Sequence, residues 1–432
     1  MNIHRKIDRG SDVWGGIARH KLSPRFYWDP ELYKDELDLI FQTTWVYVGH
    51  ESEVGEPKTF VRKKVAGQEL ILTRSSDGEV HVLFNRCTHR GSLVCNADKG
   101  EGGLLRCMYH GWVFELDGAL RGAPRSDAYS DFSQRRTTDF GLAKPAATEI
   151  YGGFIFCRLR EDGTAPSFDD FIAPVRPSID RLLRLSPNGK IDLTAGRIGH
   201  ILHCNWKMAV ESQVDNYHVN TVHQSLKEAI PNAFDPEEDL YVRHLGAGHT
   251  ELDFRPQYAK DGRLMQWVGA VKEDRVRGYV DALNARHGAE YARQVLLEGP
   301  PHVVVFPNLF LSQMNIVVFD PISVEQTAMY TTPVFFEGMD DINDRISAQC
   351  SGAMGPAGLI IADDAEIGDR NQIALHTSFP EWLDISRGRD REKSEGEDAQ
   401  VSSWGGDETP QRGMWSAYRD LMLRREPAPR AV

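Results

Sequence analysis

The chain has 432 residues, of which 41% are hydrophobic and 26% are charged, so it has the composition of an ordinary globular protein with two or three domains. Its formal net charge of −13 argues against a nucleic-acid partner, because phosphates attract basic surfaces. No stretch reaches the roughly 20 apolar residues of a membrane helix, and the polar N-terminus does not resemble a signal peptide. We therefore expect a cytoplasmic protein without membrane segments.

The first predicted element is a helix near the N-terminus. Asp29 and Pro30 have the pattern of a helix N-cap followed by proline at the first helical position. Apolar residues then recur at helical spacing as far as Phe41. We expect residues 1–44 to form a helical segment that packs on the later, catalytic part of the chain.

Short β-rich runs follow this helix and indicate a small β domain. They cover residues 59–65, 69–74, 80–84 and 151–159. The sequence Ser-Ser-Asp-Gly between the second and third runs is a turn signal and predicts a hairpin. We therefore place an all-β domain at residues 45–157.

Two pairs of metal-ligand residues lie inside this domain. Cys87 and His89 form a C-x-H arm, and Cys107 and His110 form a C-x-x-H arm. Two thiolates and two imidazoles can hold a [2Fe–2S] cluster in the Rieske arrangement, with cysteines on one iron and histidines on the other. Neutral imidazole donates less charge than thiolate, so such a cluster accepts electrons more readily. The motif predicts an electron relay.

Two other interpretations of these four residues are less favourable. Zinc binds Cys2His2 tetrahedrally, but zinc motifs usually place Cys with Cys and His with His, whereas each arm here carries one of each. A disulfide is disfavoured by the mixture with histidine and the lack of a secretory signal. The remaining cysteines are scattered and are expected to be small buried hydrophobic residues: Cys95, Cys157, Cys204 and Cys350.

Residues 158–432 are expected to form a second domain in which strands and helices mix. The strongly polar stretch 386–413 predicts an extended or mobile segment. Trp415, Tyr418 and Met422 then recur at helical spacing. They predict a C-terminal helix that docks on the body of the protein or on a neighbouring subunit.

A second metal site is indicated within residues 205–223. Glu211, Asp215 and His218 are spaced by four and three, so one helix face would carry all three. His223 follows His218 by five residues, which turns it about 140° away on an ideal helix. Both histidines can reach one metal only if the helix ends or bulges between them, for example through a π-bulge.

Two histidines and one carboxylate form the facial triad of non-heme Fe(II) oxygenases, so a third ligand must come from elsewhere. The segment 355–364 has a proline near its start and an apolar run, which predicts a buried helix that carries two adjacent acids. Asp364 is preferred over Asp363 because it shares a face with three isoleucines. The alternative is a solvated helix whose histidines make ordinary hydrogen bonds.

Together these motifs resemble those of the α (large, oxygenase) subunit of the Rieske non-heme iron aromatic-ring-hydroxylating oxygenases. The matching pieces occur in family order: CTHRGSLVC, CMYHGWVF, NWKMAVESQVDNYHVNTVH and GPAGLIIADD. The resemblance implies an α+β protein, with a small all-β Rieske domain and a helix-grip catalytic domain in which helices cover an antiparallel sheet. It also implies two cofactors, a [2Fe–2S] cluster on Cys87, His89, Cys107 and His110 and a mononuclear Fe(II) on His218, His223 and Asp364.

The resemblance further implies that Asp215 links the two metals across a subunit boundary. It implies a homotrimer (α3), or α3β3 with a small β subunit. Electrons must come from a separate reductase, with or without a ferredoxin, because no nicotinamide or flavin fingerprint is found in the sequence. NAD(P)H would be the ultimate donor.

The implied reaction uses O2 to hydroxylate an aromatic ring in aromatic catabolism. We expect cis-dihydroxylation of an aromatic acid or a related aromatic compound, although monooxygenation and O-demethylation would use the same metal ligands. A non-catalytic Rieske electron carrier with a binding domain is the alternative from a different class. It predicts two iron atoms per chain where an oxygenase predicts three, and it needs only the small β domain.

The substrate pocket is expected within residues 226–319. His249 could contact substrate, and a substrate carboxylate would need a cation. The available cations are Arg243, Arg255, Arg263 and Lys272. Bulky apolar residues of this region either line the pocket or belong to the core: Phe234, Phe254, Trp267, Phe306, Phe310 and Met314.

Overall fold

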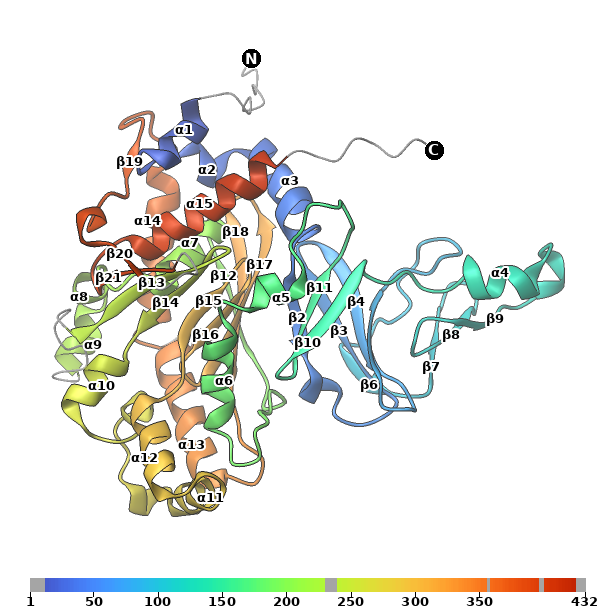
Figure 1. Cartoon of the computed structure of the whole chain (residues 1–432). Coiled ribbons are helices and arrows are strands. Elements are labelled where there is room, and N and C mark those ends of the chain that lie inside the picture. Colours follow the sequence, from blue (N-terminus) through green and yellow to red (C-terminus); the bar gives the residue numbers. More distant parts are fainter. Residues whose placement is uncertain (1–11, 230–238, 356–357, 396–399, 425–432) are drawn as a thin grey trace. The chain divides into compact units, whose positions relative to one another are not determined.

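The computed structural model describes residues 12–229, 239–355, 358–395 and 400–424. The chain divides into two compact units, of which one comprises Phe41–Ala165 and the other joins Met1–Ile40 to Pro166–Val432 (Figure 1). No helix in the described ranges is long and apolar enough to cross a membrane.

The smaller unit is built almost entirely from short antiparallel strands in three sheets. The sheet orders are β5-β4-β3-β6, β7-β8-β9 and β10-β11-β2. The strands are β2 (Val46–His50), β3 (Thr59–Val65), β4 (Gln68–Arg74), β5 (Val80–Phe84), β6 (Lys99–Glu101), β7 (Leu104–Arg106), β8 (Val113–Glu115), β9 (Leu120–Gly122), β10 (Ala147–Tyr151) and β11 (Phe154–Arg158). Helix α4 (Phe132–Thr138) is the α-helix of the described part of this unit.

The first three predicted strands and the hairpin between β4 and β5 are confirmed, with β4 beginning one residue earlier than expected. The predicted strand at 151–159 is wrong at its start, because Tyr151 ends β10. Gly152 and Gly153 then turn the chain with φ of 59° and 87°, which glycine adopts without a Cβ clash. The following strand begins only at Phe154.

The larger unit is organised around a nine-stranded antiparallel sheet of order β12-β18-β17-β16-β15-β14-β13-β21-β20. Its strands are β12 (Ile198–Leu202), β13 (Tyr241–Gly246), β14 (His249–Asp253), β15 (His302–Val305), β16 (Leu309–Ser312), β17 (Asn315–Ser323), β18 (Gln326–Pro333), β20 (Lys393–Glu395) and β21 (Gln400–Trp404). A separate two-stranded ladder pairs β1 (Lys21–Leu22) with β19 (Leu383–Asp384).

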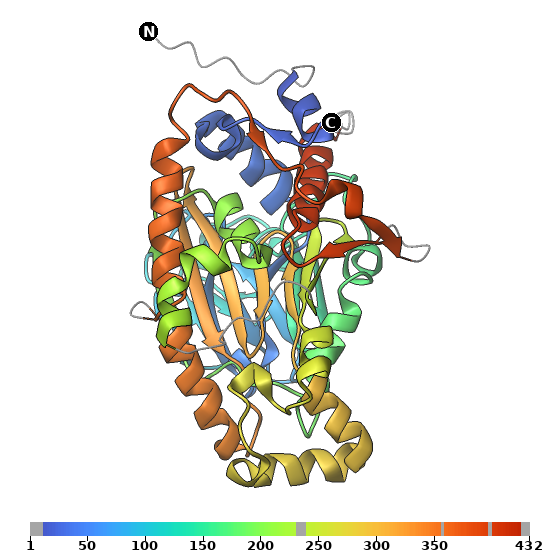
Figure 2. The same cartoon turned by 90° about the vertical axis from the view of Figure 1, so that its left-hand side faces the viewer.

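Helices surround this sheet. They are α1 (Asp12–Ala18), α2 (Arg25–Trp28), α3 (Pro30–Glu36), α5 (Phe168–Ile172), α6 (Arg176–Arg184), α7 (Trp206–Glu211), α8 (Val219–Val222), α9 (Gln224–Ala229), α10 (Arg255–Asp261), α11 (Arg277–His287), α12 (Ala289–Glu298), α13 (Asp340–Gln349), α14 (Ile361–Ala374) and α15 (Thr409–Leu423). Helix α7 packs on β17 and β18, and α15 packs on β13 and β14. Figure 2 shows α14 and α13 along one side of the strands.

The predicted N-terminal helix is confirmed as α3. The side chain of Asp29 accepts a hydrogen bond from the backbone N–H of Glu31 at 3.0 Å, and Pro30 occupies the first helical position. Asp29 is itself held by Arg25 at 2.6 Å.

The prediction of an extended or mobile segment at residues 386–413 is only partly right for its described residues, which contain two paired strands and also the start of a helix. Strands β20 and β21 form a hairpin that continues the large sheet beside β13, and α15 begins at Thr409. The charged residues of the segment pair with one another, as Arg391 does with Asp407 and Arg412 with Glu392. The polar composition of this segment therefore reflects ion pairs within the folded chain and not mobility. Residues 396–399 lie outside the described ranges.

The C-terminal helix docks on the body of this chain, as predicted. Trp415 and Tyr418 are fully buried, and the Tyr418 hydroxyl donates to Glu36 of α3 at 2.7 Å. The same carboxylate accepts hydrogen bonds from the Trp206 indole at 2.7 Å and from the Lys207 ammonium at 2.5 Å. Burial lowers the pKa of Lys207, and an ammonium in such a place needs this carboxylate to offset its lost hydration. Glu36 thus joins α3, α7 and α15.

Candidate functional site

The Cys-His arms of the smaller unit lie on two loops, one after β5 and one after β7. The loops repeat the same hydrogen bonds: Gly91 N–H donates to the Cys87 carbonyl at 2.9 Å, and Gly111 N–H donates to the Cys107 carbonyl at 3.0 Å. Both glycines have positive φ, of 77° and 72°, a conformation that favours glycine. Each loop therefore closes as a tight turn around its cysteine.

The repeated turns bring the four side chains together. Cys87 and Cys107 are buried in one hydrophobic cluster, and the rings of His89 and His110 are 4.6 Å apart. The thiols lie close enough for a hydrogen bond, and burial raises the pKa of Cys87. Trp112 stacks on His89 at 4.9 Å and fixes the plane of that ring.

The state of His89 fits a metal ligand. Its Nδ1 is buried, and within the described ranges it has no hydrogen-bond partner. Burial and the neighbouring His110 lower the pKa of His89, which favours the neutral imidazole that binds metals. Two sulfurs and two imidazoles, one of them with an unpartnered buried nitrogen, fit a [2Fe–2S] cluster of Rieske type.

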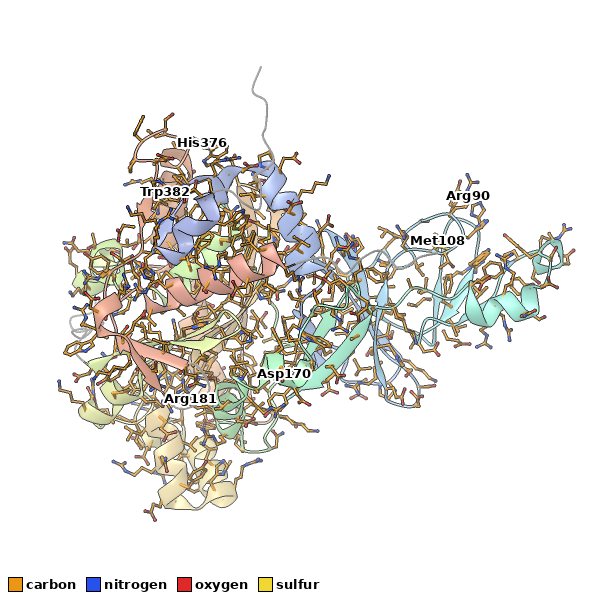
Figure 3. The ribbon with its side chains drawn as sticks, turned by 45° about the horizontal axis from the view of Figure 1, so that its top comes forward. Arg90, Met108, Asp170, Arg181, His376 and Trp382 are labelled. Carbon is orange, nitrogen blue, oxygen red and sulfur yellow. The ribbon has the colours of Figure 1, made fainter. Side chains whose placement is uncertain are left out.

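The outer surface of these loops is exposed. Met108 is 76% exposed, and Arg90 of the first loop lies over the Tyr109 ring of the second at 5.8 Å (Figure 3). The loops therefore meet at a surface that is partly apolar.

In the larger unit, the segment with the two histidines is not one continuous helix. Helix α7 ends at Glu211, a 3-10 turn follows at Ser212–Val214, and Asp215 is extended with ψ of 102°. The expectation that Glu211, Asp215 and His218 share one helix face is therefore wrong. His218 caps the start of the single-turn helix α8 and His223 caps its end, so the chain leaves the helix at the second histidine and has no π-bulge there.

The third group comes from α14. This helix begins at Ile361, so Asp363 and Asp364 stand in its first turn and not deep in a longer helix, as the sequence had suggested. Residues 356 and 357 lie outside the described ranges. The Asp364 carboxylate is 3.4 Å from His218 Nε2 and 3.2 Å from His223 Nε2.

His218, His223 and Asp364 each offer one ligand atom, and these atoms all lie within 4.8 Å of one another. Asp364 is more enclosed than Asp363, whose carboxylate is 3.6 Å from His223 Nδ1 and accepts a hydrogen bond from Ser225. The preference for Asp364 agrees with this geometry. Two imidazoles and one carboxylate on one side of a site fit a non-heme Fe(II) centre.

Electrostatics also mark a place for a cation. Burial lowers the pKa of His218, but Asp215 and Asp364 outweigh it and raise the pKa to about 9. Burial acts to raise the pKa of Asp364, but hydrogen bonds from His218 and His223 lower it. The site therefore favours positive charge between its carboxylates.

Asp215 orients the first histidine. One carboxylate oxygen is 3.3 Å from His218 Nδ1, and the other accepts a hydrogen bond from the backbone N–H of Tyr217 at 2.7 Å. With Nδ1 held by Asp215, Nε2 of His218 is turned toward Asp364. This is the usual arrangement in which a carboxylate fixes the tautomer of a metal-binding histidine.

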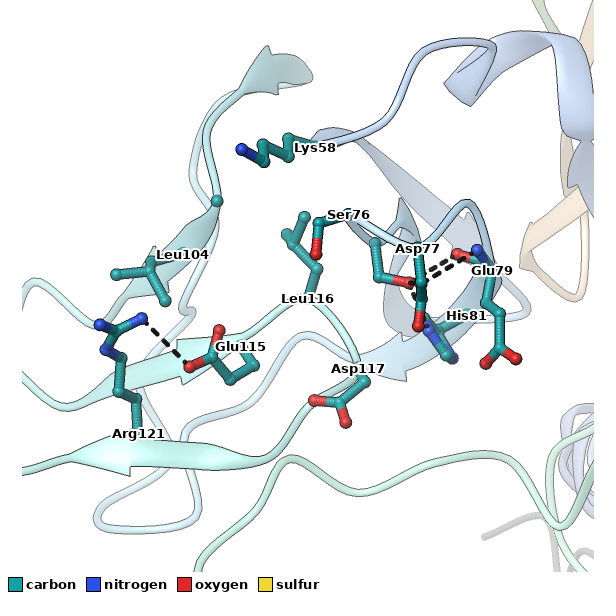
Figure 4. A pocket seen from close by; sticks show the side chains of 12 residues that line it. Lys58, Ser76, Asp77, Glu79, His81, Leu104, Glu115, Leu116, Asp117 and Arg121 are labelled. Carbon is teal, nitrogen blue, oxygen red and sulfur yellow. Dashed lines mark hydrogen bonds and ion pairs between the residues drawn. The ribbon is translucent and has the colours of Figure 1, made fainter.

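A cavity of about 290 Å³ adjoins the triad. Its walls include Asp215, His218 and Asp364 together with apolar residues of α7, β18 and α14. A larger, polar cavity of about 720 Å³ lies in the smaller unit, where Arg121 pairs with Glu115 at 3.3 Å (Figure 4). The larger cavity contains none of the motif residues.

Most of the proposed substrate-binding cations are engaged elsewhere. Arg243 and Arg255 both pair with the buried Asp253, at 3.0 Å and 2.8 Å, and Arg263 pairs with Asp261. Lys272 precedes a 3-10 turn, and no ion pair to it is found among the described residues. A substrate carboxylate would have to compete with the chain's own acids for these arginines.

His249 is not available to a substrate. Its Nε2 is 2.9 Å from the Phe171 carbonyl, and its Nδ1 accepts from the Phe306 N–H at 3.0 Å. Most of the bulky apolar candidates are core residues, since Trp267, Phe306, Phe310 and Met314 are buried. Phe254 is partly buried against a small cluster, and Phe234 lies outside the described ranges.

Comparison with known families identifies the family to which the two sets of motifs belong. The Rieske [2Fe-2S] domain family matches residues 44–137, and the family described as ring hydroxylating alpha subunit (catalytic domain) matches residues 182–424. The chain belongs to the ring-hydroxylating α-subunit family.

Relatives of this ring-hydroxylating α subunit include subunits of several oxygenases. It is 31% identical over 304 residues to the N,N-dimethyl phenylurea N-demethylase subunit alpha of Sphingobium, a match that covers 68% of this chain and 63% of that protein. It is 28% identical over 390 residues to the anthranilate 1,2-dioxygenase large subunit of Acinetobacter baylyi, covering 85% and 80%. Naphthalene 1,2-dioxygenase from Rhodococcus has the same fold, with a TM-score of 0.81 at 24% identity over 97% and 100% of the chains.

These matches confirm the main expectations from sequence. The ring-hydroxylating α subunit is an α+β protein with an all-β Rieske domain and a catalytic domain of antiparallel sheet and helices. It is an oxygenase of aromatic rings that uses a [2Fe–2S] cluster and a mononuclear iron. Members of the family depend on a separate reductase and work as components of oligomeric assemblies.

Sequence reasoning missed the surroundings of Glu211. Tyr27 from α2 and Trp415 from α15 both donate to its carboxylate. Glu211 was visible in the motif, but its partners lie far away in the sequence, so no local pattern could have indicated them.

Proposed function

We propose that this chain binds both iron centres through the residues that its two sets of motifs supply. The proposed cluster ligands are Cys87, His89, Cys107 and His110, and the proposed iron ligands are His218, His223 and Asp364. The approach of three ligand atoms to within 4.8 Å, from elements well separated in sequence, carries this proposal. When bound, the cluster supplies single electrons and the mononuclear iron supplies the redox chemistry that lets O2 react with an aromatic ring.

The proposed domains correspond to the two sets of ligands, one for the cluster and one for the iron. We propose residues 45–157 as the Rieske domain and residues 158–432 as the catalytic domain, with residues 1–44 packed on the catalytic part. The position of Glu36 beside α7 and α15 supports this packing.

Asp215 is proposed to connect the two centres between neighbouring subunits. One of its oxygens orients His218, and the side chain remains about one-third exposed, so it can also reach an imidazole of another copy. This role requires more than one copy of the chain, and we propose an α3 trimer, or α3β3 with a small β subunit. A reductase, with or without a ferredoxin, and NAD(P)H complete the proposed electron chain.

The proposed reaction is cis-dihydroxylation of an aromatic acid or a closely related aromatic compound. Relatives named for anthranilate, toluate and 2-halobenzoate dioxygenases support the acid class. The internal ion pairs of Arg243 and Arg255 favour substrates that do not depend on these cations. The phenylurea N-demethylase relative supports monooxygenation or demethylation as the second candidate.

Turnover with isotopically labelled O2 tests the reaction. The purified protein would be supplied with NADH, a generic reductase and ferredoxin, and a panel of aromatic acids, phenylureas and hydrocarbons. Two labelled oxygen atoms in the product indicate dihydroxylation, and one indicates monooxygenation or demethylation. A protein with two iron atoms per chain and no product from any compound would support the electron-carrier alternative.

The cluster assignment can be tested with two buried cysteines of the same hydrophobic cluster. Cys107→Ser is expected to abolish the visible absorption of the Rieske centre, because a hydroxyl replaces one thiolate ligand. Cys95→Ser is the matched control, since Cys95 is buried beside the site but its thiol faces the Ala97 carbonyl at 3.3 Å. Equal loss of colour in both variants, or in neither, would contradict the assignment.

A further inference from the structure

Glu211 ends α7 and forms part of the wall of the cavity that adjoins Asp215, His218 and Asp364. The Tyr27 hydroxyl donates to one oxygen of its carboxylate at 2.6 Å, and the Trp415 indole N–H donates to the other at 2.8 Å. The carboxylate is therefore held in one orientation by elements from both ends of the chain.

Both of these hydrogen-bond donors are neutral. Lys207 is the cation on the same helix, but its ammonium binds Glu36 at 2.5 Å. No ion pair to Glu211 is found in the part of the chain that the structure describes. Glu211 is half-buried. A carboxylate withdrawn from water without a counter-ion is costly, and such a group reduces the cost by taking up a proton.

Acids predominate among the other charged residues of the cavity wall, and Asp215 among them favours the protonated form of Glu211. Asp215 follows on the same segment, and the cavity wall also contains Asp364, Asp384 and Glu408. His218 is the basic group in this wall, and it is paired with Asp215 and Asp364. Burial, assisted by Asp215, raises the pKa of Glu211 to about 7, although Tyr27, Trp415 and Lys207 act in the opposite direction.

We infer that Glu211 is a proton-holding residue of the catalytic cavity, which releases a proton toward Asp215 and His218 during turnover and takes it back from solvent. The inference rests on the proposed function. Formation of a cis-diol consumes one O2, two electrons and two protons, and the reductase supplies the electrons. In the proposed step the O–H bond of Glu211 breaks, the proton passes into the cavity, and the carboxylate that remains is stabilised by Tyr27 and Trp415.

The neighbours of Glu211 explain why it could act repeatedly. Loss of the proton leaves a negative charge on Glu211, which an apolar environment would strongly disfavour. Here Tyr27 and Trp415 already donate hydrogen bonds to the two oxygens and stabilise that charge. A pKa of about 7 suits a proton donor that works near neutral pH. Proton supply should therefore be full below pH 7 and should fall as the pH rises above it.

Infrared difference titration of the holoprotein tests the protonation directly and requires no turnover. We expect a carboxylic-acid band that disappears with a midpoint near pH 7, is absent from Glu211→Gln and is retained in Glu408→Gln, the control in the same cavity wall. Tyr27→Phe should move the midpoint upward, because it removes a hydrogen bond that stabilises the carboxylate. If Glu211→Gln does not fold, the shift of the midpoint in Tyr27→Phe decides whether the band belongs to Glu211. A band unaffected by these variants, or no carboxyl group that titrates near neutral pH, would overturn the inference.

A turnover experiment tests the catalytic consequence. Glu211→Gln with its full iron content is expected to form product at least about 100-fold more slowly, the lower range for loss of a positioned acid, and to lose the decline above pH 7. Wild-type turnover with an unchanged pH profile in this variant would overturn the proton role. If no substrate is turned over by the unmodified protein, the proposed function fails, while the infrared result still decides the protonation of Glu211.

Discussion

Replacement of Asp364 by alanine is expected to reduce the iron content from three atoms per chain to two, while the colour of the cluster remains. Asp364 lies between His218 and His223, at 3.4 Å and 3.2 Å from their Nε2 atoms, and supplies the carboxylate of the proposed triad. Two imidazoles alone bind Fe(II) weakly, because a facial site needs three protein ligands. Product formation should fall below detection. Iron analysis and visible absorption measure the two centres separately.

Asp363→Asn provides a matched control on the same helical turn. Asp363 is 3.6 Å from His223 Nδ1 and accepts from Ser225, so asparagine can keep these contacts. We expect this variant to retain three iron atoms per chain and most of the activity. If Asp363→Asn loses iron and Asp364→Ala keeps it, the assignment of the third ligand is wrong.

The second large effect is expected for Asp215→Asn. Asparagine is nearly the same size and can still contact His218, so both metals should stay bound. It lacks the charge that supports a proton on an imidazole and connects two such rings. Product formation should fall by about 10- to 100-fold or more, the range for loss of a carboxylate that orients a metal ligand. Rapid-mixing measurements of cluster reoxidation in the presence of substrate and O2 would locate the slowed step.

Asp384→Asn is the appropriate comparison, because Asp384 lines the same cavity but bonds to Ser386 instead of a histidine. This variant should reoxidise its cluster at the normal rate. An Asp215→Asn protein that turns over substrate as fast as the unmodified protein would show that this carboxylate does not connect the two centres.

The cluster arms could be predicted from sequence because each is a local unit. Five residues contain both proposed ligands of an arm and the glycine that closes the turn, as in Cys87, His89 and Gly91. The strands on either side were predicted for the same reason, since alternation and turn residues are local signals.

The sequence brought together the three residues of the proposed iron site, but it did not predict their local backbone geometry. The spacing of His218 and His223 required a break in the helix, yet the break begins earlier, at Asp215, where the backbone becomes extended. The start of α14 at Ile361 likewise depends on how the chain enters the helix, which the proline of this segment did not indicate.

Long-range pairing was beyond sequence reasoning. From the sequence alone, Arg243 and Arg255 are candidates for binding a substrate, because Asp253 becomes their neighbour only when β13 and β14 pair in register. The same holds for His249, whose ring nitrogens are both occupied by backbone groups from other segments. Such contacts depend on which distant segments become neighbours in the fold, and local sequence patterns do not show this.

The convergence of α3, α7 and α15 on Glu36 ties the proposed iron site to distant parts of the chain. Trp206 and Lys207 follow Glu36 by 170 and 171 residues, and Tyr418 follows it by 382 residues. Glu211 likewise receives a hydrogen bond from Trp415, which follows it by 204 residues. The orientation of α7, the helix that leads into the proposed iron ligands, therefore depends on side chains of α3 and α15 that lie far from it in the sequence.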